Sequence, residues 1–458
     1  MVQNERGVAL LIVLLLAVIL SLLILSLAVS SMRENQISTE FENHEKALLV
    51  ADAGLNSAKV LLRGKDLDAL LSQATSIPSY LPDSNPRPFA YRNPINLREA
   101  RNINFDSPPG ASARTDYGWL TPAGGTVIGG GRYFAKLSDN SDDSDPRSDG
   151  DGIVCLRVMG VHAGSFTEVS THGTSRKNSV AVVEAILKRD TTFQLESPLT
   201  IPASDTVTPF GGAQFKVDGY DHSSIFDSTD DIGNHDDDDL PDFPAVNVVY
   251  DNPPSNSSET VDDIVDSLKK NEKDNFDGTG GTPSIVDGTV DVKADPDSQK
   301  ILDPNFLDRF VSYVNVYADE KVPPGQSPKG GYGTAENPRM ILAQGDLKIA
   351  GNATGYGLLV VKGELDITGN FSYNGMMLVI GEGSMNVHGA ASVLGGALIA
   401  NITPTKELGT ATFSVHGGGN PRAGIYNSSD KIAMGLSLLP MRIISWREIT
   451  DEIEPPAN

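Results

Sequence analysis

A short leader and a long apolar run open the chain. The leader spans residues 1–6, and no charged side chain occurs between Gly7 and Met32. A helix over Val8–Val29 would be about 33 Å long at about 1.5 Å per residue, enough to cross the roughly 30 Å hydrocarbon core of a bilayer. The pattern therefore predicts a helix that can span a membrane.

A cleaved secretory signal is the alternative explanation of this run. Such a signal has a shorter apolar core, roughly 7–15 residues, followed by small residues at a cleavage site. The triplet Ala28-Val29-Ser30 fits a site of that kind. The charges of Glu5 and Arg6 cancel in the leader, so the positive-inside rule gives little help with orientation.

The segment after the run continues as an amphipathic helix. No proline occurs before Pro78, and glutamate and lysine side chains stand off the apolar stripe. The stripe has helical spacing: Phe41, Leu48, Leu55 and Leu62 are seven residues apart, with Ile37, His44, Ala51 and Ala58 between them. One helix is therefore predicted over about residues 8–62. This continuation favours a permanent anchor, because a removable signal does not need it.

In these residues the chain resembles the PilX-type minor pilins of type IV pili. The resemblance rests on the leader ending in Glu5-Arg6-Gly7, on the apolar run that starts at Val8, and on the stretch VADAGLNSAKVLL. The family usually has Ala-Glu-Ala-[Ala/Gly]-Leu in that stretch, so Asp52 stands where glutamate is common. The match covers roughly the first 65 residues.

The resemblance implies a class III-like prepilin leader over residues 1–7 and a transmembrane and stalk helix over residues 8–65. A prepilin peptidase would cut between Gly7 and Val8, and Val8 would become a methylated N-terminus. The helix would hold the subunit in the inner membrane, single-pass with its head in the periplasm, until it joins a pilus at the cell surface. The implied partners are this peptidase, other minor pilins and the inner-membrane pilus assembly machinery.

Ile12 is the fifth residue after the expected cut. Most major pilins have glutamate there, which pairs with the N-terminal amine of a neighbouring subunit. Isoleucine fits either an ordinary lipid-facing position or a subunit that need not engage the subunit ahead of it, as at a filament tip. PilX-type minor pilins and the tip pseudopilin of type II secretion share this absence, so Ile12 does not separate the two classes.

Short strands replace the helical pattern farther along the chain. Residues 131–139, 152–163 and 178–189 are rich in branched and aromatic residues and predict three strands. Three antiparallel strands packed on the outer half of the stalk would make a pilin-like β head over residues 71–190. Cys155 lies in the second strand, where a buried structural thiol is expected, and a single cysteine gives no disulfide framework.

An internal repeat with an offset of 18 residues marks the region over residues 335–404. Gly345, Leu347, Ile349, Gly351 and Asn352 recur as Gly363, Leu365, Ile367, Gly369 and Asn370. A third, degenerate copy starts at Ile380. Glycine and asparagine tolerate the left-handed conformation of tight corners, and a short period with strands predicts coils of a parallel β-solenoid.

The remaining regions are predicted to add loops, helices and strands to the β head and to the repeat region. Residues 191–334 form a mixed insertion of loops and helices with acidic tracts, with helices expected after Thr260 and after Asp303-Pro304. Residues 211–224 resemble a stray coil, and residues 405–458 are expected to return to the sheet near the stalk. The predicted fold class is α+β, mainly β after a long N-terminal helix, with an antiparallel sheet and a parallel β-solenoid.

Negative charge dominates the composition. The formal net charge is −24, which makes nucleic acid an unsuitable partner because phosphate binding needs clustered lysine and arginine. Two tracts, residues 139–152 and 227–242, contain six and eight aspartates. Oxygen ligands on a glycine-containing loop suit calcium, and the candidate ligands are Asp143, Asp145, Asp149 and Asp151. A solvated acidic loop is the favoured explanation of both tracts, since neither tract matches an EF-hand, and calcium is the alternative for the first tract.

Catalytic motifs are missing from the sequence. It has no HExxH, no G-x-x-x-x-G-K-[ST] and no G-x-S-x-G. Asp218, Asp221 and His222 lie close together in VDGYDHS and are the best residues for a hydrolase hypothesis. The repeat carries no paired acidic residues along one face, so we expect no enzyme and no certain cofactor.

Three functions fit these patterns. The favoured one is a minor pilin that takes part in the assembly or priming of a type IV pilus, near its tip, with a large exported head for interaction or cell adhesion. The second is a type II secretion pseudopilin. The third is a membrane-anchored surface protein or a polysaccharide-acting β-helix enzyme, which needs no cleavage after Gly7.

Overall fold

The structure is a computed structural model of the whole chain. It describes residues 3–71, 120–122, 125–140, 149, 152–163, 167–170, 173–176, 178–189, 194–207, 215–222, 242–251, 260–416 and 422–449. The chain divides into two compact units. Unit 1 comprises Met1–Leu61, Leu67–Lys188 and Ile443–Asn458, and unit 2 comprises Leu62–Asp66 and Arg189–Arg442. A long N-terminal helix followed by mainly β structure, with antiparallel and parallel sheets, confirms the predicted fold class.

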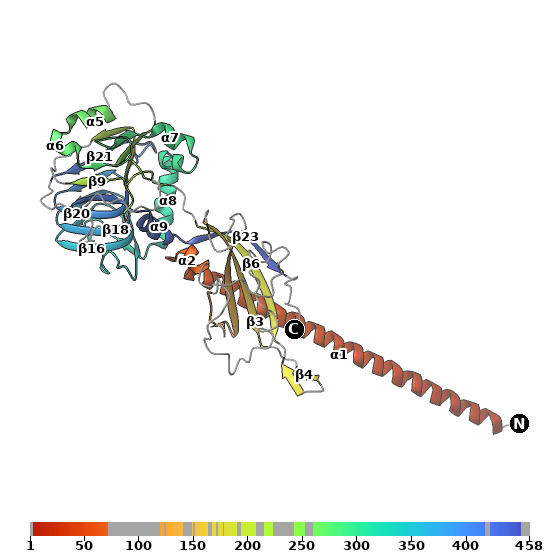
Figure 1. Ribbon diagram of the computed structural model, residues 1–458. Coiled ribbons are helices and arrows are strands. Elements are labelled where there is room, and N and C mark those ends of the chain that lie inside the picture. The colour runs from red at the N-terminus through yellow and green to blue at the C-terminus, as the bar shows by residue number, and fades with distance from the viewer. Residues whose placement is uncertain are drawn as a thin grey trace, which may run out of the picture. The chain divides into compact units, whose positions relative to one another are not determined.

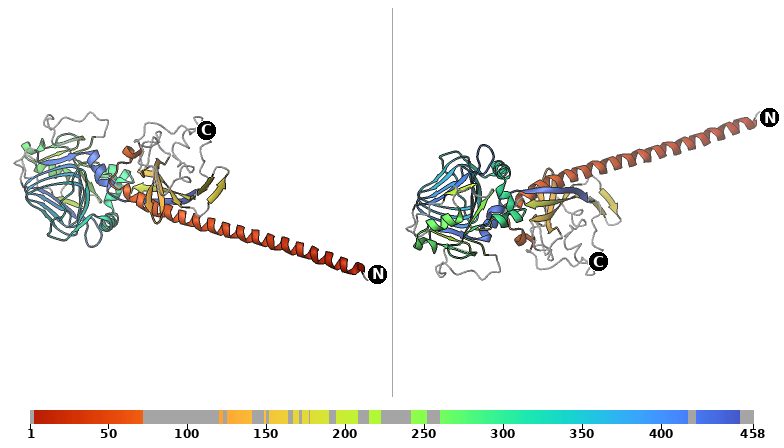
Figure 2. Two further views of the ribbon diagram at one scale, coloured as in Figure 1. Left: turned by 90° about the horizontal axis from the view of Figure 1, so that it is seen from below. Right: turned by 90° about the horizontal axis from the view of Figure 1, so that it is seen from above.

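Helix α1 (Gln3–Leu61) is one unbroken helix in unit 1 (Figure 1). Every side chain of residues 10–38 is exposed, and the first buried side chain after them belongs to Asn43. The predicted stripe is correct at Ala51, Leu55 and Ala58, which are buried. Ile37 and Phe41 are 67% and 62% exposed, because among the described residues the sheet of unit 1 covers only the later part of the helix (Figure 2).

The sheet of unit 1 has the strand order β1-β2-β3-β6-β23. Its strands are β1 (Thr126–Ile128), β2 (Gly131–Asp139), β3 (Ile153–His162), β6 (Ser179–Arg189) and β23 (Met441–Ile449). Strands β1, β2, β3 and β6 pair in antiparallel fashion, and all three predicted strands agree with the structure to within one residue at each end. The remaining described elements of unit 1 are α2 (Leu67–Leu71) and the antiparallel pair β4 (Thr167–Ser170) and β5 (Gly173–Arg176).

The predicted return of the C-terminal segment to this sheet is confirmed by β23, which is its last strand in the pairing order. The stretch LSLLPMRIISWREI, residues 436–449, predicts a strand over its whole length, and the structure differs at its start. Residues 436–437 belong to helix α9 (Ser429–Ser437), and the strand begins only at Met441, after Pro440. Proline cannot continue a helix, so the change of structure falls beside it.

Small residues let α1 lie close against the sheet. A Cβ added at Gly160 on β3 would lie 2.1 Å from the carbonyl oxygen of Ala47 on α1. On the next strand, Tyr133 packs over Gly54 and its hydroxyl lies 3.0 Å from Ser57 Oγ. The backbones of helix and strand therefore approach to a distance that only glycine permits at these points.

A buried ion pair crosses the sheet at its centre. The Arg157 guanidinium donates two hydrogen bonds, of 2.8 Å and 2.6 Å, to Glu184 Oε2, and Arg447 donates one of 2.8 Å to Oε1. Burial alone raises the pKa of the Glu184 carboxyl, but the two arginines outweigh it and hold that pKa below its usual value. Burial also raises the pKa of the Cys155 thiol to about 12, so this thiol is an inert core group, as expected.

Two parallel sheets stack their coils in unit 2 (Figure 1). The larger sheet has the order β11 (Phe276–Asp277), β9 (Lys216–Asp218), β22 (Gly424–Asn427), β20 (Ala390–Asn401), β18 (Asn370–Gly381), β16 (Asn352–Val361), β14 (Arg339–Ala343) and β13 (Glu320–Val322). The smaller one has the order β15 (Leu347–Ile349), β17 (Glu364–Ile367), β19 (Ser384–Val387), β21 (Thr410–Val415) and β8 (Asp205–Val207). The short strand β9 lies in the stretch that resembles a stray coil.

The repeat has a direct structural meaning. Asn352 pairs with Asn370 and Ile349 with Ile367, so the offset of 18 residues equals one coil. The next coil is two residues longer, because Asn370 pairs with Ala390. The Asn370 side chain donates a 3.0 Å hydrogen bond to Asn352 Oδ1, which links these two coils at their exposed corner.

The two sheets enclose one hydrophobic core. Ile349, Leu365 and Ile367 of the smaller sheet are at most 1% exposed and lie in the same cluster as Leu359 and Val379 of the larger sheet. Other residues of β14, β16, β18 and β20 form a second cluster with helices on the opposite face of the larger sheet. Because both faces of the larger sheet are covered, the sequences of these strands are continuous apolar runs without alternation.

Residues 191–334 add both helices and strands to unit 2. Strands β7 (Leu199–Ala203), β10 (Val246–Tyr250) and β12 (Ile285–Asp287) extend the larger sheet, beyond the residues of the repeat. The helices are α5 (Val261–Ser267), α6 (Lys270–Lys273), α7 (Thr289–Ala294), the 3-10 helix η1 (Ser298–Leu302) and α8 (Pro304–Tyr317). Both expected helix starts are present, with a capping box at Thr260 and Asp303 as the N-cap of α8.

Candidate functional site

The exposed apolar part of α1 is the largest uncovered hydrophobic surface among the described residues. Its leucine, isoleucine and valine side chains between Leu10 and Val29 are 43–70% exposed. This is the one helix in the described part of the chain that is long and apolar enough to cross a membrane. Water does not stabilise such a surface, since each buried large side chain is worth about 1.5–3 kcal/mol. Lipid, or apolar helices of neighbouring subunits, would cover it.

The predicted processing residues lie within this helix. Gly7 and Val8 belong to α1, which starts before them at Gln3. Ile12 is 51% exposed on the same helix. No charged residue lies within one helical turn of it in either direction along the chain. The peptide between Gly7 and Val8 is thus flanked by leader on one side and by the uncharged run on the other.

The calcium hypothesis falls mostly outside the described residues. Asp143, Asp145 and Asp151 are not among them, and nearly all of the second acidic tract is also outside. Asp149 is described, and its backbone N–H donates a 2.6 Å hydrogen bond to Asp68 Oδ1. No group of three or more candidate metal ligands occurs among the residues that the structure describes. Calcium binding by these aspartates stays a prediction.

The structure brings the residues of the hydrolase hypothesis together and uses one of them as a helix cap. Asp221 accepts hydrogen bonds from the backbone N–H and the hydroxyl of Ser429, at 2.7 Å and 3.1 Å, at the start of α9. His222 Nε2 lies 3.2 Å from Asp218 Oδ2, and the His222 backbone N–H donates to Asn427 O. His222 and Asp221 are each 9% exposed, so this cluster joins β9, β22 and α9 inside unit 2.

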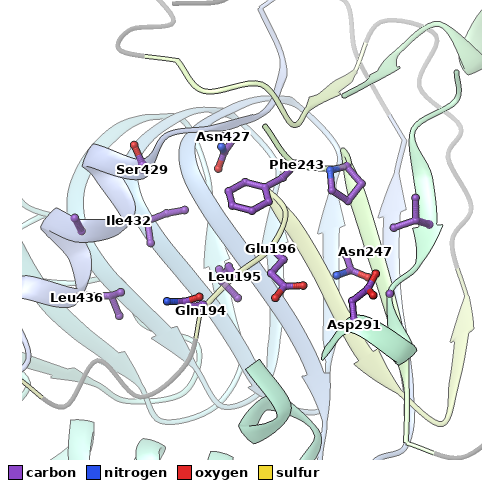
Figure 3. A pocket seen from close by; sticks show the side chains of 14 residues that line it. Gln194, Leu195, Glu196, Phe243, Asn247, Asp291, Asn427, Ser429, Ile432 and Leu436 are labelled. Atoms are coloured by element: carbon purple, nitrogen blue, oxygen red, sulfur yellow. The ribbon is translucent and has the colours of Figure 1, made fainter. Parts of the chain in front are cut away.

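Unit 2 also contains a pocket that the sequence analysis did not predict (Figure 3). Its volume is about 620 Å³. The lining residues come from β10, β12, β22, α7, α9 and the segments just before β7, β10 and α7: Gln194, Leu195, Glu196, Phe243, Pro244, Asn247, Val286, Gly288, Asp291, Asn427, Ser429, Ile432, Ala433 and Leu436. One signal was available in the sequence, because Asn247 interrupts the apolar run AVNVVY at the centre of a strand.

Comparison with known proteins gives little further identification. No family model matches the chain, and no curated protein matches it. Three solved chains match, among them the competence-associated pilin ComZ from Thermus thermophilus in its crystal structure. That chain is 12% identical, the match covers 89% of this chain and 97% of ComZ, and the TM-score is 0.20.

Proposed function

We propose that this protein is a minor pilin of type IV pili, of the PilX type, anchored by α1 and carrying unit 2 as a large exported head. One observation carries the proposal. The helix α1 is apolar and uncovered over its first half, while small residues of its second half pack against an antiparallel sheet. The first half of such a helix can lie in a membrane and later in a filament core made of similar helices. Its second half attaches it to a folded domain.

The proposal includes the processing and the partners that the leader implies. Prepilin peptidase cuts between Gly7 and Val8, and the mature subunit then waits in the inner membrane with its head in the periplasm. It joins other minor pilins through the inner-membrane assembly machinery. The head serves interaction or adhesion at the cell surface, and we propose no catalytic role for it.

Substituting Gly7 by arginine is expected to block the cut in cells that contain prepilin peptidase. A long charged side chain next to the cleaved peptide replaces a residue with no side chain, so the bond no longer fits an enzyme that accepts glycine there. Intact-mass analysis of the wild-type chain should show Val8 as the first residue, and of Gly7→Arg should show the uncut leader.

The matched control is Asn4→Arg, which adds the same charge to the leader without touching the cut. This variant should be processed like the wild type. A wild-type chain that keeps Met1, or that starts at Ser31 after signal-peptidase cleavage, would contradict the proposal. Recovery of the mature chain in secretion complexes and never in sheared pili would instead favour the pseudopilin.

Ile12 supports a place at the filament tip. In a filament, an unpaired ammonium group at Val8 is expensive to bury among apolar helices. A glutamate at the fifth mature position would pair with the amine of a neighbour, and Ile12 cannot. Such a subunit is poorly suited to repeated addition along a shaft but is tolerable once, at an end. The head also favours an end position, because unit 2 alone spans residues 189–442 and would crowd a shaft.

Replacing Ile12 by glutamate is therefore expected to change where the subunit is found. Immunogold labelling should show the wild type as a few copies at or near the tip, and Ile12→Glu at additional positions along the shaft. The control Val13→Glu places a carboxylate on the next residue, where it has no amine to pair with, and should not enter the shaft. Even labelling of the shaft by the wild type would contradict the tip role.

A further inference from the structure

The pocket of unit 2 has an apolar floor and one aromatic wall. Leu195, Val286, Ile432 and Leu436 line it with aliphatic groups, and Figure 3 shows the Phe243 ring between Ile432 and Asn247. A volume of about 620 Å³ lies within the range of small-molecule sites, roughly 300–1,000 Å³. The pocket can therefore hold a molecule of one or two rings.

Hydrogen-bond acceptors are concentrated on one side of the pocket. Asn247 is 2% exposed, and its Oδ1 has no hydrogen-bond partner among the described residues. The Glu196 and Asp291 carboxylates lie on the same side of the pocket as Asn247 in Figure 3. Glu196 Oε1 already accepts a 3.0 Å hydrogen bond from Ser298, which fixes that side chain and leaves its other oxygen available.

The Asn247 amide lies against the backbone at Gly288. A Cβ at Gly288 would lie 2.1 Å from Asn247 Oδ1, so glycine at this position makes room for the amide. Asn247 also pairs in register with Thr200 on β7 and Val286 on β12, in the middle of the extended sheet. A buried amide oxygen without a partner is unfavourable, and a bound donor would remove that cost.

The lining excludes acidic ligands. None of its residues is a lysine, an arginine or a histidine, and two of them carry carboxylates. A phosphate, sulfate or carboxylate group in this pocket would face like charges with no compensating cation. A purely apolar ligand would leave the acceptors of Asn247 and Glu196 unpaired. The lining thus suits a ligand that is rich in donors, has one apolar face and carries no acid group.

We propose that this pocket binds a sugar without acid groups, on the scale of a mono- or disaccharide. Ring hydroxyls donate to the carboxylates and to Asn247, and amides such as that of Gln194 both donate and accept, as adjacent hydroxyls require. The apolar C–H face of the sugar ring packs on Phe243. An amino group on the sugar would pair with the same carboxylates, so neutral and amino sugars form one class here. The proposal stands on unit 2 and does not rest on the filament role.

The experiment uses the full chain in detergent on a glycan array that holds neutral, amino and uronic-acid oligosaccharides. Binding to neutral or amino glycans is expected, with uronic-acid glycans of the same length at least tenfold weaker. The strongest sugar is then titrated against the wild type by calorimetry. No binding to any neutral or amino glycan, or equal binding to the uronic acids, would overturn the proposal.

Two variants tie the binding to this pocket. Ala433→Phe places a ring inside the pocket from an exposed position on α9 and should weaken the titrated affinity at least tenfold. Asp430→Phe puts the same ring on the same helix at an exposed residue outside the lining and should leave the affinity unchanged. Phe243→Ala, which removes the aromatic wall without adding bulk, should also weaken binding. Unchanged affinity in both pocket variants would show that the sugar binds elsewhere.

Discussion

Ile367→Asp is expected to destabilise unit 2 by several kcal/mol. The Ile367 side chain is 0% exposed and lies in the core between the two parallel sheets, with Ile349 and Val387 as its partners in the neighbouring coils. An aspartate there would face the aliphatic side chains of Ile349 and Val387, which cannot pair with its charge. An unpaired buried carboxylate costs more than the transfer energy of the lost isoleucine, and the variant should melt far below the wild type.

Thermal unfolding of the full chain in detergent, followed by limited proteolysis, measures this effect. Thr354→Asp is the matched control, since it introduces the same residue into β16 of the same unit at an exposed position. Its melting temperature should stay within a few degrees of the wild type. If Ile367→Asp melted like Thr354→Asp, the packing of this residue between the sheets would be refuted.

The elements with strong periodic patterns could be predicted from the sequence. The three strands of unit 1 and the coils of the repeat follow from alternation and from the recurrence of Gly351 as Gly369. Local capping chemistry gave the starts of α5 and α8, because Thr260 and Asp303 bond to backbone groups within a few residues. These patterns depend only on residues that are close together in the chain, so they can be recognised from the sequence alone.

Contacts between distant segments could not be predicted in the same way. Strands β7 and β10 join the larger sheet from residues that read as an insertion, because short apolar runs without a repeat do not reveal their neighbours. The end of the covered face of α1 also depends on distant residues. Phe41 fits the helical stripe as well as Leu55 does, but only Leu55 meets the sheet.

The same difference between local patterns and distant contacts applies to the candidate sites. The uncovered helix was predicted, because its length and lack of charge are properties of one segment. The pocket was not, because Glu196, Asn247 and Asp291 come from three separate segments that meet only in the fold. Asn247 was a single polar residue within a strand, and its significance depends on Gly288, which makes room for it.

A column of glycines runs through the larger sheet, inside strands β16, β18 and β20. Gly357 pairs with Gly375 and Gly375 with Gly395, and their φ angles are 124°, 139° and 136°. A Cβ at Gly375 would lie 2.0 Å from the carbonyl oxygen of Gly357, and one at Gly395 would lie 2.0 Å from that of Gly375. Each glycine therefore allows both an unusual backbone angle and the stacking of its coil on the preceding one.

Gly375→Ala is expected to destabilise unit 2 by about 2–6 kcal/mol. The strained φ angle accounts for roughly 1–3 kcal/mol of this, and the forced separation of two coils for a similar amount. Gly281→Ala separates the two contributions, because Gly281 has a φ of 108° but an added Cβ would meet nothing within 4 Å. That control should lose only about 1–3 kcal/mol. Denaturant unfolding of both full-length variants in detergent compares them directly. Equal losses would mean that backbone strain alone, and not the contact between coils, makes glycine necessary in this column.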